Sequence, residues 1–463
     1  MIITIDEGTS STRALLIDQN GQILKTSQQE FKQIYPQSSW VEHDPIEIYQ
    51  KTLECVKAVM NESVTGIAIT NQRETTIIWD KNTGKPIYNA IVWQCKRSAN
   101  ICKALKSQQQ FSDYIYKTTG LIIDSYFSAS KIMWLIDNIV KPKKLNIEDL
   151  IFGTIDTWLI WNLTKGASHL TDTSNASRTM LYDIHQNQWD DLILETLAIP
   201  KSLLPKVIDS NANFGEAEIN GKKIPILAVL GDQQAAYYAY GAKAKATYGT
   251  GTFLLLPNSG IINKGLLVSN AHSKSGISQL CNEGSIFVGG SLIQWLKDEM
   301  KFIKSSSEIE ALANSVKDSG GVYLIPALAG LGAPYWNENA RGSIFGITRA
   351  TSQANIARAA LESLAFRVRD IFEALDDESR KTISELNVDG GASRNDTLMQ
   401  FQADLLQIPI KRHKDTEMTA LGAALMTGHV NLELSVDKVF EPKQNLDHRY
   451  QEWKKYLSLL IGN

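Results

Sequence analysis

The sequence contains one short pattern twice, and this repeat limits the possible folds more than any other feature does. Near the start, an apolar run at 2–5 leads through a glycine-containing turn into a second apolar run at 14–17. Far downstream, the segment 247–251, Thr-Tyr-Gly-Thr-Gly, leads into the apolar run 252–256. Both segments predict strand and tight-turn units. The repeat therefore indicates a duplicated architecture of two related halves.

The spacing of apolar residues elsewhere predicts strands that alternate with helices. Short apolar runs at 64–70 and 224–230 are typical of buried strands. Residues 355–376 carry apolar side chains at the 3.6-residue period of an amphipathic helix, and further helices are expected after 395 and at 419–429. This alternation indicates an α/β fold.

The length of the chain requires more than one hydrophobic core. Its 463 residues exceed the roughly 250–300 residues at which single cores stop growing. We expect two domains, 1–240 and 241–463, with the boundary after the segment 232–236 and the glycine at 241. No Pro- or Ser-rich linker marks this boundary.

Charge and cysteine content argue against several classes of protein. The chain has 47 Lys and Arg against 50 Asp and Glu, a net charge of -3, so nothing indicates a nucleic-acid partner or a membrane surface. The start lacks a basic region and a cleavage site, and no apolar run reaches the ~18 residues of a membrane span. We expect a cytoplasmic protein whose four cysteines are free thiols: Cys55, Cys95, Cys102 and Cys281.

Two turns are candidates for phosphate binding, since the motifs G-x-x-x-x-G-K-[ST] and G-x-G-x-x-G are both absent. The turn at 8–12 offers one glycine and four hydroxyl residues, whose N–H and O–H groups can surround an anion. Asp6 could hold Mg²⁺ through water, and Arg13 could neutralise phosphate charge. The turn at 248–251 is the second candidate. Each turn could instead be a plain hairpin.

Gly390 and Gly391 stand between a predicted strand and a predicted helix. Two glycines at this position allow the backbone to approach an adenine ring or an α-phosphate closely. They could also serve tight packing of the strand on the helix. The sequence leaves both interpretations open.

Asp232 follows the apolar run 224–230 and precedes a stretch of small residues that predicts a helix. A carboxylate at the end of a strand is well placed as a general base, because ligands of α/β sheets bind outside the carboxyl ends of the strands. The alternative is a helix N-cap.

Arg73 and Glu74 are adjacent and opposite in charge, in a polar run that follows the predicted strand 64–70. Together they offer a fork of donors and a pair of acceptors for neighbouring hydroxyl groups. Three aromatic residues could form flat apolar walls against the carbon faces of a polyol, although aromatic residues more often belong to the core: Trp93, Tyr126 and Phe253.

Read together, these segments resemble the FGGY carbohydrate kinases over nearly the whole chain, and within that family the members that act on glycerol. The resemblance depends on several strings that occur in order. They are NQRETT at 71–76, GKPIYNAIVWQC at 84–95, YFSASKIMW at 126–134, GTIDTWLIW at 153–161, NASRTM at 175–180, GDQQA at 231–235 and GLGAPYW at 330–336.

The resemblance implies two ribonuclease-H-like domains of the actin, hexokinase and Hsp70 type, with ATP and substrate in a cleft between them. It implies phosphorylation of glycerol to sn-glycerol 3-phosphate by ATP with Mg²⁺, or of another polyol or a ketose as the alternative. A homodimer or homotetramer is expected. The competing class is a non-catalytic ATP-binding scaffold, and the presence of Asp232 and Arg73 argues against it.

The resemblance also assigns roles by position. The residues expected to bind the polyol are Arg73, Glu74, Trp93, Tyr126, Asp232, Gln233 and Phe253, with Asp232 as the catalytic base. Those expected to bind the nucleotide are Thr9, Ser10, Ser11, Arg13, Thr250, Gly290, Gln294, Gly391 and Asn395. The expected metal ligands are Asp6 and Asp232.

Three positions depart from the family pattern. Glu7 stands where most relatives have Gln, and we expect it to add negative charge beside the first phosphate turn. Ala129 replaces a usual Gly. The turn at 220–225 is shorter than the loop through which some bacterial relatives bind an inhibitory sugar bisphosphate, so that regulation is not expected.

Overall fold

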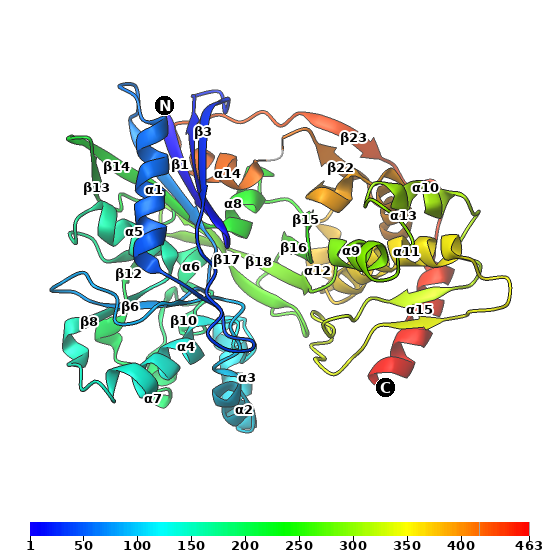
Figure 1. Ribbon diagram of the computed structural model, residues 1–463, viewed down its shortest axis with the longest axis horizontal. Helices are drawn as coiled ribbons and strands as arrows, with labels where there is room; N and C mark the ends of the chain where they lie inside the picture. The colour runs from blue at the N-terminus through cyan, green and yellow to red at the C-terminus, as the bar shows by residue number, and fades with distance from the viewer. Residues whose placement is uncertain (416, 463) are drawn as a thin grey trace. The chain divides into compact units, whose positions relative to one another are not determined.

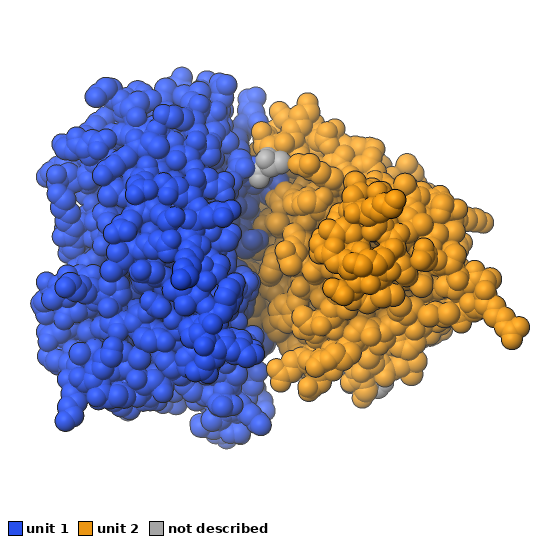
Figure 2. Space-filling model, viewed as in Figure 1, with its two compact units in different colours: residues 1–241, 268–280, 417–433 blue, residues 242–267, 281–416, 434–463 orange. Residues whose placement is uncertain are grey.

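The computed structural model describes residues 1–415 and 417–462. Its chain divides into two compact units (Figure 2). Unit 1 contains 1–241, 268–280 and 417–433, and unit 2 contains 242–267, 281–416 and 434–463. Two segments from the second half of the sequence thus belong to unit 1. The limits 1–240 and 241–463 for the functional domains stay a prediction.

The main sheet of unit 1 has the strand order β13-β14-β5-β1-β2-β3. Strands β1, β2 and β3 are antiparallel neighbours, β5 and β14 run parallel to β1, and β13 is antiparallel to β14. The strands are β1 (Ile2–Glu7), β2 (Ser11–Ile17), β3 (Ile23–Glu30), β5 (Gly66–Asn71), β13 (Glu216–Ile219) and β14 (Lys222–Gly231).

Helices cover both faces of this sheet. On one face, α1 (Pro45–Val59) contacts β1, β2 and β3 (Figure 1), and a core of buried apolar residues fills the space between them. Helix α1 begins where the Asp44 side chain accepts a hydrogen bond from the N–H of Ile46, a normal N-cap. On the other face lie α8 (Asp232–Ala239) and α14 (Met418–Met426), which contact each other and β14.

Helices α8 and α14 cross closely because Gly422 has no side chain. A Cβ atom at Gly422 would lie 1.8 Å from the carbonyl oxygen of Ala235, a distance that no side chain tolerates. This contact holds α8, whose first residue is Asp232, against α14.

The remainder of unit 1 consists of short helices and two-stranded sheets inserted between the main strands. The sheets pair β4 (Glu42–His43) with β7 (Ala90–Ile91), β6 (Ile77–Asp80) with β8 (Leu150–Gly153), β9 (Leu170–Asp172) with β12 (Lys206–Ile208), and β10 (Tyr182–Asp183) with β11 (Gln188–Trp189). The helices are α2 (Ala99–Lys106), α3 (Gln109–Thr119), α4 (Ser128–Leu135), η1 (Ile136–Val140), η2 (Ile147–Asp149), α5 (Ile155–Leu163), α6 (Thr173–Ala176), α7 (Asp191–Thr196) and η3 (Lys201–Leu203).

The second large sheet has the order β17-β18-β16-β15-β21-β22-β23, and the residues 268–280 of its first hairpin are grouped with unit 1. Its strands are β15 (Lys245–Tyr248), β16 (Thr252–Pro257), β17 (Leu267–Lys274), β18 (Ile277–Ile286), β21 (Leu386–Asp389), β22 (Ile410–His413) and β23 (Val436–Phe440). A small sheet pairs β19 (Tyr323–Ile325) with β20 (Ser343–Phe345).

Unit 2 has one continuous hydrophobic core, in which the long helix α11 packs against α10 and α13 (Figure 1). Helix α11 begins at a capping box formed by Ser352 and Asn355. The helices of unit 2 are α9 (Gly290–Asp298), α10 (Glu308–Asn314), α11 (Gln353–Glu373), α12 (Asp377–Lys381), η4 (Gly391–Arg394), α13 (Asp396–Leu406) and α15 (Asp447–Ile461).

The two large sheets share one topology, which confirms the predicted duplication. In each, three antiparallel strands (β1-β2-β3 and β15-β16-β18) are continued by two strands parallel to the first of them (β5-β14 and β21-β22). This is the predicted α/β fold of two ribonuclease-H-like halves. The helix predicted at 355–376 is α11, and the strands predicted at 64–70 and 224–230 are β5 and β14.

Candidate active site

The carboxyl ends of three parallel strands of unit 1 meet at one edge of the sheet. Glu7, the last residue of β1, pairs with Asn71 of β5, and Asn71 pairs with Gly231 of β14. The residues that follow each strand therefore leave the sheet side by side. These are the predicted phosphate-binding turn at 8–12, called the first phosphate turn below, the polar run from 72 onward, and Asp232 at the start of α8.

Arg73, Glu74 and Asp232 form a chain of ionic contacts at this edge. The Nε atom of Arg73 lies 3.5 Å from Oδ1 of Asp232 and 3.7 Å from Oε1 of Glu74. Glu74 also accepts a 2.7 Å hydrogen bond from Nε of Arg178. The side chains of Arg73 and Glu74 are 4% and 2% exposed, whereas that of Asp232 is 33% exposed. Asp232 is thus the most exposed of the three side chains.

The surroundings of Asp232 raise the pKa of its carboxyl group to about 6. Removal from bulk water is the largest cause, and the charges of Glu74 and Asp6 act in the same direction. The Arg73 guanidinium and the N–H of Gln233 oppose it, the latter through a 2.7 Å hydrogen bond to Oδ1 of Asp232. A carboxylate with this pKa is mostly ionised at neutral pH and still basic enough to accept a proton.

Two of the three predicted aromatic walls lie together in unit 1. The rings of Trp93 and Tyr126 are 5.5 Å apart at 58°, and the guanidinium carbon of Arg178 lies 5.3 Å from the centre of the Tyr126 ring. Both rings are half-buried. Phe253 belongs to β16 of unit 2, also half-buried.

The first phosphate turn is held by hydrogen bonds to its backbone. Gly8 N–H donates to the Ser11 carbonyl, and side chains donate to the carbonyls of Gly8 and Thr9 at 3.0 Å. The Trp93 indole N–H donates to Oγ1 of Thr9 at 3.0 Å, which connects the turn to the aromatic wall. Ser10 is exposed, and Thr9 and Ser11 are half-buried.

Arg13 is engaged by two carboxylates of unit 1. Its guanidinium donates to Asp6, its partner in the β1–β2 register, and at 2.6 Å to Glu417 at the start of α14. Any phosphate bound by Arg13 would have to compete with these two anions. Sequence patterns gave no signal for Glu417, because it lies 404 positions away.

Asp6 and Asp232 are the two oxygen donors expected to hold Mg²⁺. Within residues 1–415 and 417–462, no group of three or more His, Cys, Asp or Glu side chains is arranged to hold a metal ion. The two carboxylates nonetheless interact, since the charge of Asp6 raises the pKa of Asp232, and burial raises the pKa of Asp6 itself. Each carboxylate is also paired with an arginine, Asp6 with Arg13 and Asp232 with Arg73. A hydrated Mg²⁺ that takes its other ligands from water and phosphate would share these two oxygen donors with the arginines.

Glu7 points away from Asp6, to the face of the sheet that α1 covers. Ile3, Ile5 and Glu7 alternate onto that face, and Oε2 of Glu7 accepts a 3.4 Å hydrogen bond from Thr52 of α1. The side chain is completely buried, and Oε1 has no hydrogen-bond partner. Burial raises the pKa of Glu7 well above its ordinary value. The side chain therefore faces α1 rather than the phosphate turn, and burial disfavours the charged form that we expected beside that turn.

The burial of Glu7 leads to a pH-dependent prediction for stability. Because its pKa is raised in the folded state, Glu7 lowers the free energy of unfolding progressively as pH rises above the ordinary pKa of about 4.5. Glu7→Gln keeps the shape and removes the titration. We expect this variant to gain about 1.4 kcal/mol over the native chain per unit of raised pKa, and only above that pH.

Unfolding midpoints of both proteins at about pH 5 and about pH 8 measure this effect. Glu54→Gln on the exposed side of α1 is the matched control, with no expected pH-dependent difference. A gap between Glu7→Gln and the native chain that is the same at both pH values would contradict the assignment.

In unit 2, the second predicted phosphate-binding turn, at 248–251, is joined by hydrogen bonds to the start of α9. The carbonyl of Thr250 accepts hydrogen bonds from the N–H groups of Gly289 and Ser291, and the carbonyl of Gly249 accepts one from Gly290. A Cβ atom at Gly290 would lie 2.9 Å from that Gly249 carbonyl. The predicted nucleotide residues Thr250 and Gly290 are thus brought together.

Gly390 and Gly391 serve different purposes. Gly390 has φ 86° and packs on the Tyr248 backbone, where a Cβ atom would lie 2.6 Å from the carbonyl oxygen. This is the packing interpretation, and it places the glycine pair beside the second phosphate turn. A Cβ atom at Gly391 would meet no described atom within 4 Å, so this position is open to a ligand. The packing interpretation therefore applies to Gly390, and close approach of a ligand at Gly391 stays a prediction.

The remaining predicted nucleotide residues of unit 2 have partners of their own. Asn395 is the N-cap of α13, where its side-chain oxygen accepts a 2.8 Å hydrogen bond from the Leu398 N–H. Gln294 of α9 donates from its side chain to Asp298 one turn later.

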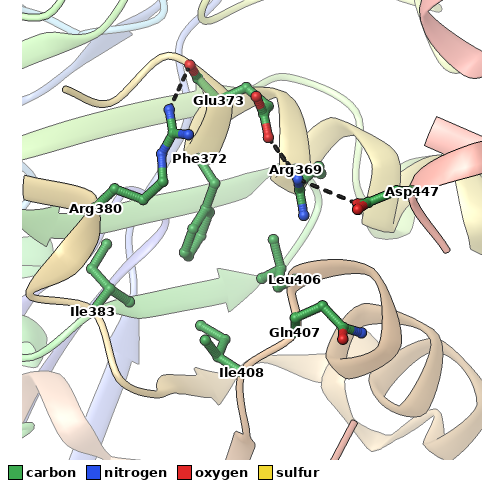
Figure 3. A pocket seen from close by; sticks show the side chains of 9 residues that line it. All are labelled: Arg369, Phe372, Glu373, Arg380, Ile383, Leu406, Gln407, Ile408 and Asp447. Atoms are coloured by element: carbon green, nitrogen blue, oxygen red, sulfur yellow. Dashed lines mark hydrogen bonds and ion pairs between the residues drawn. The ribbon is translucent and has the colours of Figure 1, made fainter. Parts of the chain in front are cut away.

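Two surface cavities lie in unit 2. Among the residues that the structure describes, none of those predicted to bind substrate, nucleotide or metal lines either cavity. The smaller, of about 260 Å³, has an apolar floor between the ends of α11 and α13 (Figure 3). Its Arg369 pairs with Glu373 and Asp447, so the wall charges are compensated. The larger, of about 650 Å³, lies over α10, α13 and β23.

Sequence reasoning missed Arg178 as a site residue. The residue belongs to the string at 175–180, yet its role as the partner of Glu74 depends on a contact across 104 positions. Its 0% exposed side chain, placed against Tyr126, makes it a buried support of the residues predicted to bind the polyol.

Known proteins resemble the chain over nearly its whole length. Residues 1–239 match the N-terminal domain of the FGGY family of carbohydrate kinases, and residues 244–430 match its C-terminal domain. The glycerol kinase of Alkaliphilus oremlandii is 49% identical, over 98% of this chain and 96% of that protein. Glycerol kinase 2 of Thermotoga maritima is 46% identical, over 100% and 99%.

A solved structure agrees with these sequence relatives. The crystal structure of Plasmodium falciparum glycerol kinase with ADP superposes with a TM-score of 0.91 at 33% identity, covering 99% of this chain and 98% of that one. In the described part of the chain, no helix combines the length and the apolar character that crossing a membrane requires.

Proposed function

Because the chain belongs to the FGGY family of carbohydrate kinases, we propose that it transfers the γ-phosphoryl group of ATP to glycerol and forms sn-glycerol 3-phosphate. The observation that carries this proposal is the ionic chain of Arg73, Glu74 and Asp232 at the carboxyl ends of β5 and β14. The relatives named glycerol kinase, at 46–49% identity, support glycerol as the substrate.

In this proposal Asp232 is the general base. It accepts the proton of a terminal hydroxyl group as that oxygen attacks the γ-phosphorus, and the bond from phosphorus to the bridging oxygen of ADP breaks. The pKa of about 6 supports the role, because the group is ionised before the reaction and can hold the proton after it.

The other groups of unit 1 orient the alcohol. Arg73 supplies N–H donors and Glu74 supplies acceptors for the remaining hydroxyl groups. Both side chains are buried, and Arg178 holds Glu74 in place. Trp93 and Tyr126 offer flat apolar surfaces for the carbon chain. Positioning of this kind accounts for much of the rate in phosphoryl transfer. Gln233 and Phe253 complete the proposed set of polyol contacts.

The nucleotide is proposed to contact both turns. In unit 1 the proposed contacts are Thr9, Ser10, Ser11 and Arg13; in unit 2 they are Thr250, Gly290, Gln294, Gly391 and Asn395. The ADP named with the Plasmodium structure supports a nucleotide site in this fold. Asp6 and Asp232 would hold Mg²⁺, which neutralises phosphate charge when bound. The interdomain cleft, a homodimer or homotetramer and a cytoplasmic location stay predictions.

A panel of alcohols tests the substrate assignment. ADP release is measured with glycerol, dihydroxyacetone and xylulose under the same conditions. We expect kcat/KM for glycerol to exceed that of the others by at least about 10-fold, the effect of one well-placed polar contact. A preference for xylulose would instead indicate the alternative, an FGGY kinase acting on a ketose.

A further inference from the structure

Lys131 is a completely buried lysine beside the polyol residues, and the proposed mechanism does not use it. It lies on α4, and its Nζ atom donates hydrogen bonds to three successive carbonyl groups. The distances are 2.7 Å to Ser125, 2.5 Å to Tyr126 and 3.1 Å to Phe127. Burying a lysine is costly unless its charge is well compensated, so a position of this kind calls for an explanation.

The segment 125–127 that Lys131 binds presents Tyr126 to the site. The Tyr126 ring lies against Trp93, and against Arg178, which in turn binds Glu74. The start of α4 is tied to the same group of residues, since Ser128 donates from Oγ to the Glu74 carbonyl at 3.1 Å. Displacement of the segment would therefore move the aromatic wall, while the rest of the sheet edge is held by other contacts.

The protonation state of Lys131 decides whether all three bonds can form. An ammonium group has three N–H donors, one for each carbonyl, whereas a neutral amine has two. The charged and titratable groups that act on it are Glu74, Cys95, Cys102 and Asp124. Burial lowers the pKa of Lys131 to about 8, against the opposing effect of these four groups.

We propose that Lys131 is a positioning residue of the polyol site, whose ammonium group fixes the segment 125–127 so that Tyr126 forms a wall for the substrate. This inference rests on the proposed function and deepens it. It assigns to Lys131 an effect on alcohol binding, transmitted by Tyr126, rather than contact with the reacting atoms.

The first test replaces the lysine. In Lys131→Met, KM for glycerol is expected to rise at least about 10-fold, the usual effect of losing hydrogen bonds to a charged group, while KM for ATP stays within about twofold. Lys141→Met, an exposed lysine shortly after α4, is the matched control with unchanged constants. Equal rises in both KM values, or no rise in KM for glycerol, would overturn the proposal.

A double-mutant cycle separates positioning from a general loss of structure. If Lys131 acts by way of Tyr126, then Lys131→Met adds little to KM for glycerol once Tyr126→Ala is present. Additive effects of the two replacements would contradict this route.

The native protein supplies a test that remains decisive if Lys131→Met does not fold. KM for glycerol is expected to rise several-fold between about pH 7 and about pH 9, as the third N–H donor is lost, and to stay flat in Tyr126→Ala. A flat profile in the native protein would overturn the inference. Absence of any glycerol-dependent ADP release from the native protein would instead refute the proposed function, which makes the two failures distinguishable.

Discussion

Replacing Asp232 by Asn is expected to lower kcat for glycerol by at least about 100-fold, the usual scale for loss of a general base. The amide keeps the size of the side chain and its place at the start of α8, but it cannot accept the proton of the alcohol. Its oxygen can still accept the hydrogen bond from the Gln233 N–H. Binding of ATP, measured by titration calorimetry, is expected to change by less than about threefold, because the proposed nucleotide contacts remain.

The control for this variant is Asp137→Asn, which alters an exposed ion pair with Lys141 and leaves kcat unchanged. The native enzyme provides a second check: since the pKa of Asp232 is about 6, kcat is expected to fall as pH drops below that value. Turnover of Asp232→Asn near the native rate would remove this residue from its role.

Replacing Glu74 by Gln is expected to destabilise unit 1 by about 3 kcal/mol, the scale for breaking a buried ion pair, and to raise KM for glycerol. Glu74 is the anion between Arg73 and Arg178, and all three side chains are buried. Removal of one partner from a buried ion pair leaves an uncompensated charge, which is far more costly than loss of a surface pair. Denaturant unfolding measures the first effect, and steady-state kinetics at saturating ATP measures the second.

The comparison variant is Glu218→Gln, which breaks an exposed 2.7 Å ion pair with Lys165 and is expected to change the denaturant midpoint far less than Glu74→Gln does. Similar losses in the two variants would show that burial of Glu74 does not matter. An unchanged KM for glycerol in Glu74→Gln would separate this side chain from the proposed polyol site.

Local patterns were sufficient to predict much of the fold. The turn at 248–251 joins two strands as expected, and the apolar period at 355–376 is helix α11, because short-range geometry decides both. Asp232 stands at a strand end for the same reason: an apolar run, a glycine and small residues specify β14 and then α8.

Contacts between distant residues were not accessible from such patterns. The engagement of Arg13 by Glu417 depends on α14 packing against the first sheet. The inward orientation of Glu7 depends on which face of β1 is covered by α1, and period-two alternation does not distinguish the two faces of a strand that is buried on both. The carbonyl contacts of Lys131 likewise required the path of the chain before α4.

The claim that Asp232 directs a phosphoryl group onto a primary hydroxyl group is tested most directly by identifying the product. Phosphorus NMR of a reaction of the native enzyme with ATP and glycerol, followed by an enzymatic assay for the stereoisomer, gives the answer. We predict ADP and sn-glycerol 3-phosphate in equal amounts, and at least about 100-fold less of the ester from Asp232→Asn over the same time. Release of inorganic phosphate without an ester, or an ester at the secondary hydroxyl group, would contradict the proposed site.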